Sequence, residues 1–210
     1  MKPQYNINPI NNLSIYITTL CNLHCAGCCA GSQSKNNITA SEVSELAEQI
    51  GEIDDLYITG GEPTLHKHFR DIMSEVFKIK YKKIYLATNG YNLMKYIDMM
   101  DNFNEIRISH YTKDSYPNTV PNTEKINEFV ENYKGTARVV VQPITLLQNN
   151  DKWGACARNT IGIASYFKGK IYGCCVSAGM DTAKGLPMDK NWRENAYKLE
   201  LPCSDCVFAI

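Results

Sequence analysis

Two periodicities alternate along the first 145 residues of this chain. Five short runs are rich in β-branched and aromatic residues, a composition that is typical of strands. They are LSIYITT, DLYITG, KKIYLATNG, NEIRIS and ARVVVQP. Stripes of apolar residues at helical spacing separate these runs, and Thr39 and Glu42 have the spacing of a capping box before the first stripe. Strands that alternate with helices form βαβ units around a parallel sheet. The sequence therefore predicts an α/β fold, a partial (β/α) barrel of about five to six parallel strands.

The pattern changes after residue 150. The run IGIASYFKGKIYG predicts a β-hairpin that turns near Lys168, and a short helix that carries Trp192 is expected after it. We therefore expect two units, the partial barrel in residues 1–150 and a small hairpin and helix segment in residues 151–210.

Charge and composition narrow the function classes. Basic and acidic residues number 22 each, so the chain lacks the excess positive charge that binding to a nucleic-acid backbone uses. The first ten residues, MKPQYNINPI, lack the apolar core of a signal peptide, and no stretch approaches the roughly 18 apolar residues of a membrane span. We expect a cytoplasmic protein with neither a membrane segment nor a nucleic-acid partner. Its nine cysteines then favour metal or redox chemistry over disulfides.

Three cysteines stand together after the first expected strand. Cys21, Cys25 and Cys28 follow LSIYITTL at spacings of four and three residues. Tetrahedral zinc and most iron–sulfur clusters take four protein ligands. The residues leave two interpretations open: a fourth ligand such as His24 completes a zinc site, or one coordination position stays free.

Two further strand ends carry distinctive residues. Gly60, Gly61 and Glu62 precede a proline after the second expected strand, and Thr88 and Asn89 precede a glycine after the third. In barrels of this type the carboxyl ends of the strands build the functional site. We therefore expect these residues to lie beside the three cysteines.

The CxxxCxxC spacing followed by GGEP resembles the radical S-adenosylmethionine superfamily, and the likeness extends over the first 145 residues. The resemblance implies that Cys21, Cys25 and Cys28 hold three irons of a 4Fe–4S cluster, while the fourth iron chelates S-adenosylmethionine. One electron then cleaves the cofactor, and the resulting 5′-deoxyadenosyl radical abstracts hydrogen from the substrate. An electron donor such as flavodoxin or ferredoxin is expected as a partner. Glu62 is expected to pair with the methionine ammonium group, and the two glycines before it would let backbone approach the cofactor.

Other positions complete the expected cofactor site. The resemblance implies that polar side chains contact the methionine and ribose ends of S-adenosylmethionine; the candidates are Thr88, Asn89, Ser109, Arg138 and Gln142. It also implies that the backbone of Gly27 contacts the adenine. Tyr111 and Arg138 are the catalytic candidates, as proton acceptors or substrate ligands. His66 and His68 flank a helix start and are expected at the surface, whereas His110 fits packing and site lining equally well.

The tail repeats the theme of clustered cysteines. Its pattern resembles the Twitch form of the SPASM extension, which carries one auxiliary iron–sulfur cluster. The ligands that this resemblance implies are Cys156, Cys174, Cys203 and Cys206. Cys174 is preferred to Cys175 because it completes the expected Gly-x4-Cys spacing from Gly169. A zinc site with four cysteine ligands would use the same spacing and remains an alternative.

The size and the tail together resemble aminocyclitol dehydrogenases. This resemblance implies a radical oxidoreductase that oxidises a small polar molecule, such as a sugar or cyclitol, through a second 4Fe–4S cluster. The alternative is a peptide-modifying maturase or epimerase. It ranks second because only about a dozen residues precede the first strand, which leaves no room for a leader-binding domain. A non-catalytic metal-binding protein is the alternative of another class.

Overall fold

The structure is a computed structural model of the 210-residue chain. The part of the chain that it describes comprises residues 9–25, 28, 36–111, 122–143, 162–175, 178 and 185–199.

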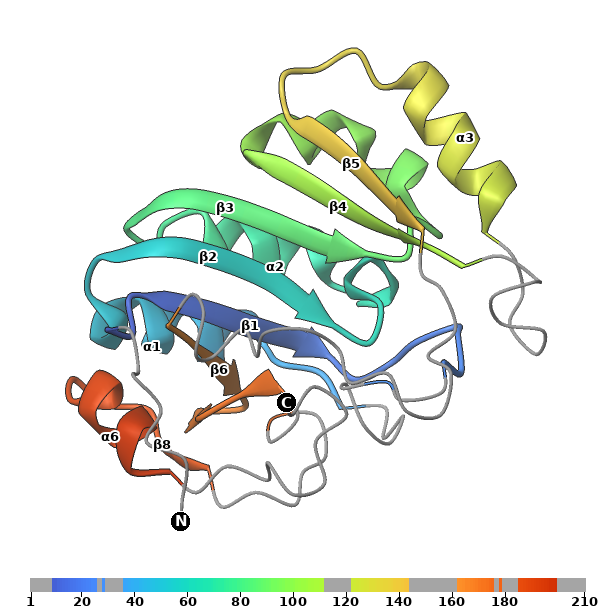
Figure 1. Ribbon diagram of the computed structural model, residues 1–210. Coiled ribbons are helices and arrows are strands. Elements are labelled where there is room, and N and C mark those ends of the chain that lie inside the picture. Colours follow the sequence, from blue (N-terminus) through green and yellow to red (C-terminus); the bar gives the residue numbers. More distant parts are fainter. Residues whose placement is uncertain are drawn as a thin grey trace.

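Within these residues the strands form one sheet of eight, in the order β5-β4-β3-β2-β1-β6-β7-β8 (Figure 1). The strands are β1 (Asn12–Thr18), β2 (Ile53–Gly60), β3 (Tyr81–Thr88), β4 (Glu105–His110), β5 (Arg138–Pro143), β6 (Ile163–Phe167), β7 (Lys170–Tyr172) and β8 (Leu186–Pro187). Strands β1 to β6 pair in parallel, which confirms the predicted α/β fold with a mainly parallel sheet.

Helices connect the parallel strands. The α-helices are α1 (Ala40–Ile50), α2 (Phe69–Val76), α3 (Thr123–Asn132) and α6 (Trp192–Lys198), and the 3₁₀ segments are η1 (Pro63–Leu65) and η2 (Leu93–Asn102). The capping box at the start of α1 is present: the Thr39 side chain accepts from the Glu42 N–H, and the Glu42 carboxylate accepts from the Thr39 N–H. Figure 1 shows α1 and α2 on one side of the sheet, behind β1, β2 and β3.

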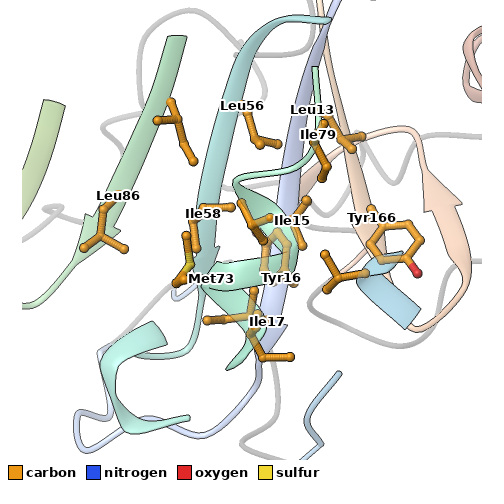
Figure 2. Packing of buried hydrophobic residues seen from close by; sticks show 14 of the residues in the cluster. Leu13, Ile15, Tyr16, Ile17, Leu56, Ile58, Met73, Ile79, Leu86 and Tyr166 are labelled. Atoms are coloured by element: carbon orange, nitrogen blue, oxygen red, sulfur yellow. The ribbon is translucent and has the colours of Figure 1, made fainter. Parts of the chain in front are cut away.

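The hydrophobic core lies between the sheet and these helices. Buried residues of β1, β2 and α2 belong to this core, and Figure 2 shows Ile58 beside Met73. All seven residues of β1 are buried, so this central strand is covered on both faces. Its position fixes the start of the cysteine loop, because that loop leaves from the carboxyl end of β1.

The opposite face of the sheet is polar and aromatic. Because the strands are in register, one row across this face contains Ser14, Tyr57, Tyr85, Glu105 and Arg138. The two tyrosine rings stack with their centroids 4.6 Å apart. This face therefore differs in chemistry from the face that the helices cover.

The segment η2 differs from the expected α-helix. Its apolar residues are buried as predicted, but the backbone is 3₁₀ and departs from helical angles at Tyr96. Leu93, Tyr96 and Met99 are three residues apart, which is the period that aligns side chains on a 3₁₀ helix. The ring of Tyr96 also packs against Phe69 with centroids 4.6 Å apart.

The tail of the chain packs on the same sheet. The predicted hairpin is present: β6 and β7 pair antiparallel through a turn at Lys168 and Gly169, whose φ angles are 48° and 73°. Strand β6 also pairs in parallel with β1. The fully buried Trp192 of α6 donates from Nε1 to the Ile50 carbonyl of α1 at 3.0 Å. The division at residue 150 stays a prediction, while these contacts join the tail to the sheet.

In the part of the chain that the structure describes, no helix is both long and apolar enough to cross a membrane.

Candidate active site

The carboxyl ends of the first two strands are joined through their backbones. The Gly61 N–H donates to the Thr18 carbonyl at 2.7 Å, and the Glu62 N–H donates to the Leu20 carbonyl at 2.8 Å. These bonds seat the turn after β2 directly against the chain that leads into Cys21. The structure therefore places the GGE turn beside the start of the cysteine loop.

The two glycines of this turn make that approach sterically feasible. Gly60 has a φ of 147°, which side-chain-bearing residues rarely adopt, and a Cβ there would overlap the Thr18 carbonyl oxygen. A Cβ on Gly61 would overlap the carbonyl oxygen of Leu20. The sequence predicted close approach to a cofactor, whereas the structure shows close approach of one strand end to its neighbour.

Glu62 is the centre of a buried hydrogen-bond network, and its side chain is completely shielded from solvent. Its Oε1 accepts from the Thr64 N–H at 3.0 Å, the Thr64 hydroxyl at 2.5 Å and the Thr88 hydroxyl at 2.7 Å. Its Oε2 accepts from the Asn89 N–H at 2.6 Å. Burial raises the pKa of Glu62, while these hydrogen bonds act in the opposite direction. The carboxylate thus ties the end of β2 to the end of β3.

Asn89 extends this network to the cysteines. Its side-chain Nδ2 lies 2.8 Å from the Asn22 Oδ1 and 3.9 Å from the Cys21 Sγ. Asn89 is 6% exposed, so its amide is held in place by surrounding protein. The third strand end is therefore connected to the first by side-chain contacts as well as by the sheet.

The cysteine loop offers sulfur donors that differ in exposure. Cys21 and Cys25 are half-buried, and Cys28 is exposed. Burial raises the pKa of the Cys21 and Cys25 thiols. Smaller opposing effects come from a hydrogen bond with Tyr111 at Cys25 and from the Leu23 N–H, which lies 3.4 Å from the Cys21 Sγ. Tyr111 is therefore beside the loop, and burial raises its own pKa. Its catalytic role stays a prediction.

The donor set fits an iron–sulfur cluster. Three thiols from one short loop, with N–H donors directed at the Cys21 sulfur, supply thiolate ligands and the hydrogen bonds that tune such clusters. Among the residues that the structure describes, no three His, Cys, Asp or Glu side chains converge on a single-ion site. In a cluster each thiolate binds a different iron, so its sulfurs do not need to converge on one point.

The next strand end adds a residue that the sequence reasoning missed. Asn122 is 3% exposed, and its Nδ2 donates to the Asn89 carbonyl and, at 3.4 Å, to the Ser109 carbonyl. Among the residues that the structure describes, its buried Oδ1 has no hydrogen-bond partner. Ser109 thus lies at the same edge as Asn89. His110 contacts the Thr123 hydroxyl at 2.8 Å through Nε2, which gives it a packing partner. An asparagine before a helix is an ordinary sequence feature and gave no signal of this bridge.

The structure separates the two β5 candidates. Gln142 pairs in register with Ser109 near the carboxyl end of β5 and is exposed. Arg138 is the first residue of β5, and its guanidinium contacts Glu105, the first residue of β4, at 3.0 Å. Arg138 therefore lies at the amino end of the strands, away from the cysteine edge. This position does not support the predicted cofactor and catalytic roles of Arg138.

Several predicted ligands lie outside the described residues, namely Gly27, Cys156, Cys203 and Cys206. Cys174 and Cys175 are both half-buried. Cys175 packs against the hydrophobic core, and its carbonyl accepts from the Tyr16 hydroxyl at 3.4 Å. The auxiliary ligand set, including the choice of Cys174 over Cys175, stays a prediction.

The prediction that His66 is a surface residue was wrong. His66 is 2% exposed; its Nε2 lies 3.0 Å from the Ile38 carbonyl, and its Nδ1 accepts from the His68 N–H at 3.1 Å. Because a carbonyl only accepts, Nε2 carries the proton and the ring is neutral. Burial lowers the pKa of His66 accordingly. The histidine holds the turn before α2 against the segment that leads into α1.

The fold and the site together define a partial (β/α) barrel with a three-cysteine loop at its carboxyl edge. Residues 15–164 match the Radical SAM superfamily. The chain belongs to this superfamily, and membership implies a 4Fe–4S cluster and S-adenosylmethionine as cofactors.

The sequence is also similar to curated proteins named as GTP 3',8-cyclases. A "Probable GTP 3',8-cyclase" of Saccharolobus islandicus is 26% identical over 146 residues, which is 66% of this chain and 47% of the relative. The "GTP 3',8-cyclase" of Synechocystis sp. is 29% identical over 109 residues, or 48% of this chain and 32% of the relative. The chain thus spans about half the length, or less, of these relatives.

Among solved structures, Streptococcus suis SuiB bound to precursor peptide SuiA is similar with 14% identity and a TM-score of 0.47, covering 99% of this chain and 72% of that one. These values support no conclusion about function.

Proposed function

We propose that this protein reductively cleaves S-adenosylmethionine and uses the product radical to remove a hydrogen atom from a small polar substrate. The observation that carries the proposal is the hydrogen-bonded edge that joins Cys21, Glu62 and Asn89. When bound by Cys21, Cys25 and Cys28, the cluster supplies the electron that breaks the C5′–S bond of the cofactor. The network of the chain's own residues keeps the first three strand ends in fixed relative positions.

The polar face of the sheet supports a polar substrate. Arg107 lies over the stacked rings of Tyr57 and Tyr85, with its Cζ 5.4 Å and 4.8 Å from their centroids. The Tyr85 hydroxyl donates to Asp55 at 3.2 Å, and Glu105 pairs with Arg107. The stacked rings and the Arg107 guanidinium suit hydroxyl, carboxylate or phosphate groups on a substrate.

The reaction we favour is a two-electron oxidation. Hydrogen-atom abstraction removes one electron and one proton from the reacting carbon. Loss of a further proton and a second electron completes the oxidation to a carbonyl. An auxiliary 4Fe–4S cluster on Cys156, Cys174, Cys203 and Cys206 would accept that second electron, and a flavodoxin or ferredoxin would supply the electron for cofactor cleavage.

A second candidate is a radical cyclisation of a purine nucleotide. The relatives named as GTP 3',8-cyclases support it, because the match to them covers 66% of this chain. The stacked tyrosines and Arg107 also have the chemistry that binds a base or a phosphate. This candidate requires no net oxidation of the substrate.

Product mass separates the two candidates. Anaerobically reconstituted protein is incubated with S-adenosylmethionine, dithionite and either GTP or an aminocyclitol, and 5′-deoxyadenosine is quantified beside the product. Loss of two hydrogens from the aminocyclitol, with one 5′-deoxyadenosine per product, supports dehydrogenation. A GTP-derived product of unchanged mass supports cyclisation. If neither compound raises 5′-deoxyadenosine above the substrate-free level, both substrate proposals fail, and a peptide substrate becomes the next to test.

A further inference from the structure

In the turn after β3, every backbone and side-chain polar atom of Asn89 has a hydrogen-bond partner. The Asn89 N–H donates to Glu62, and its carbonyl accepts from Asn122. Its side-chain Oδ1 accepts from the Tyr91 N–H at 3.0 Å. Few side chains of a site are fixed by so many partners, and the remaining group, Nδ2, faces the cysteine loop.

The orientation of this amide follows from its partners. A backbone N–H can only donate, so the side-chain atom that contacts Tyr91 must be the oxygen. The nitrogen then faces Asn22 and Cys21. Its two hydrogens serve the Asn22 Oδ1 at 2.8 Å and the Cys21 Sγ at 3.9 Å. The reversed amide would place an oxygen against the Asn22 oxygen and against the sulfur, and would lose the Tyr91 bond.

We infer that Asn89 is a positioning residue that holds the Cys21 sulfur through its side-chain amide and so raises the reduction potential of the cluster bound there. The sequence predicted that Asn89 contacts the cofactor, and that contact stays a prediction. The structure directs its amide nitrogen at Cys21, a predicted cluster ligand on a neighbouring strand end.

The physical basis is the charge that reduction adds. A reduced cluster carries one more negative charge than an oxidised one, and part of that charge resides on the cysteine sulfurs. An N–H donor stabilises the more negative form, so it makes reduction easier. The Leu23 N–H also donates to Cys21, at 3.4 Å, but it belongs to the cysteine loop itself. Asn89 lies on a neighbouring strand end, so its side-chain donor can be removed without altering the sequence of the loop.

The test is a redox titration of the reconstituted full chain, followed by electron paramagnetic resonance. The variants are Asn89→Asp, which keeps the acceptor for Tyr91 but removes the donor, and Asn89→Ala. The matched control is Asn92→Asp, because the Asn92 amide donates to the Thr64 carbonyl at 3.3 Å. The cluster in question is the one whose signal disappears in Cys21→Ala.

We expect both Asn89 variants to need a more negative applied potential. At a fixed potential the ratio of reduced to oxidised cluster should fall by about threefold to tenfold, the size expected for the loss of one ordinary hydrogen bond. Asn92→Asp should titrate like the parent. Unchanged potentials in cluster-loaded Asn89 variants would overturn the inference.

A measurement on the unaltered sequence covers the case in which both Asn89 variants fail to bind the cluster. Protein labelled with ¹⁵N only at asparagine side-chain amides is reduced, and electron–nuclear double resonance is recorded. We expect a ¹⁵N coupling to the cluster signal, and the same coupling in Asn92→Asp. Absence of any coupling from labelled amides would overturn the inference without any substitution at Asn89.

Discussion

The Oε2 atom of Glu62 and the backbone nitrogen of Asn89 lie 2.6 Å apart, and this hydrogen bond joins the turn after β2 to the turn after β3. The same carboxylate takes three further donors through Oε1. A carboxylate has about four favourable acceptor positions, so this one is close to saturated by protein. In this structure Glu62 therefore organises the site edge, and its predicted pairing with the cofactor stays a prediction.

Replacing Glu62 with Gln should destabilise the protein by about 1 to 3 kcal/mol. A carboxamide has one acceptor oxygen where the structure uses two, so the amide nitrogen would face a donor. Chemical denaturation of the parent and of Glu62→Gln measures the difference, with the exposed Glu48→Gln as control. Equal unfolding midpoints for Glu62→Gln and Glu48→Gln would contradict the organising role.

Gly61→Ala should weaken cluster loading as well as stability. The added Cβ overlaps the Leu20 carbonyl oxygen, so the chain that enters the cysteine loop must move, at a cost of about 1 to 3 kcal/mol. Iron content after anaerobic reconstitution and the unfolding midpoint are the two readouts. Gly169→Asn is the control, because no atom of the described residues lies within 4 Å of a Cβ at Gly169 and asparagine tolerates positive φ. Full iron loading of Gly61→Ala would contradict this steric account.

Trp192→Ala should cost about 3 to 5 kcal/mol of unfolding free energy. The indole is fully buried, and its Nε1 donates to Ile50 of α1. Trp192→Phe should lose less, because it keeps most of the buried area and gives up the hydrogen bond. Denaturant unfolding is the measurement, and Lys198→Ala on the exposed side of α6 is the control. Equal unfolding free energies for Trp192→Ala and Lys198→Ala would show that the packing of α6 against the rest of the fold does not stabilise the protein.

Stability should fall as the pH drops through the ordinary histidine value, because of His66. Burial lowers the pKa of His66 from 6.5, so the unfolded chain binds its proton at a higher pH than the folded protein does. Protonation favours unfolding in that range. The stabilising neutral state is present above about pH 6.5 and is lost below it. Unfolding free energies measured from about pH 7.5 to about 5.5 should decline more steeply in the parent than in His66→Gln, and parallel curves would contradict the assignment.

Local rules in the sequence predicted much of the fold. The capping box of Thr39 and Glu42 and the hairpin at Lys168 depend on neighbouring residues, and both are present. Strand direction also determines at which edge of the sheet a residue lies. Arg138 stands at the start of ARVVVQP and therefore at the amino edge, which argues against the cofactor and catalytic roles predicted for it. Period-three spacing in η2 was compatible with two helix types, and the segment is 3₁₀ with a departure from helical angles at Tyr96, whose ring packs against Phe69.

The site network was harder to predict because it depends on long-range contacts. Asn122 bridges Asn89 and Ser109, which are 33 and 13 residues away in the sequence. His66 is buried because the segment at Ile38, 28 residues earlier, supplies a carbonyl. No local pattern marks these partners. The cysteine spacing was informative because its three members belong to one loop.

The account depends most on the three cysteines at the end of β1, and cofactor cleavage tests them directly. Anaerobically reconstituted parent protein should bind about four irons through this loop and form 5′-deoxyadenosine from S-adenosylmethionine under dithionite. Cys21→Ala, Cys25→Ala and Cys28→Ala should each abolish that product, while Cys175→Ala should retain it. Undiminished 5′-deoxyadenosine in any of the three loop variants, or a parent that binds zinc there and forms none, would contradict the account.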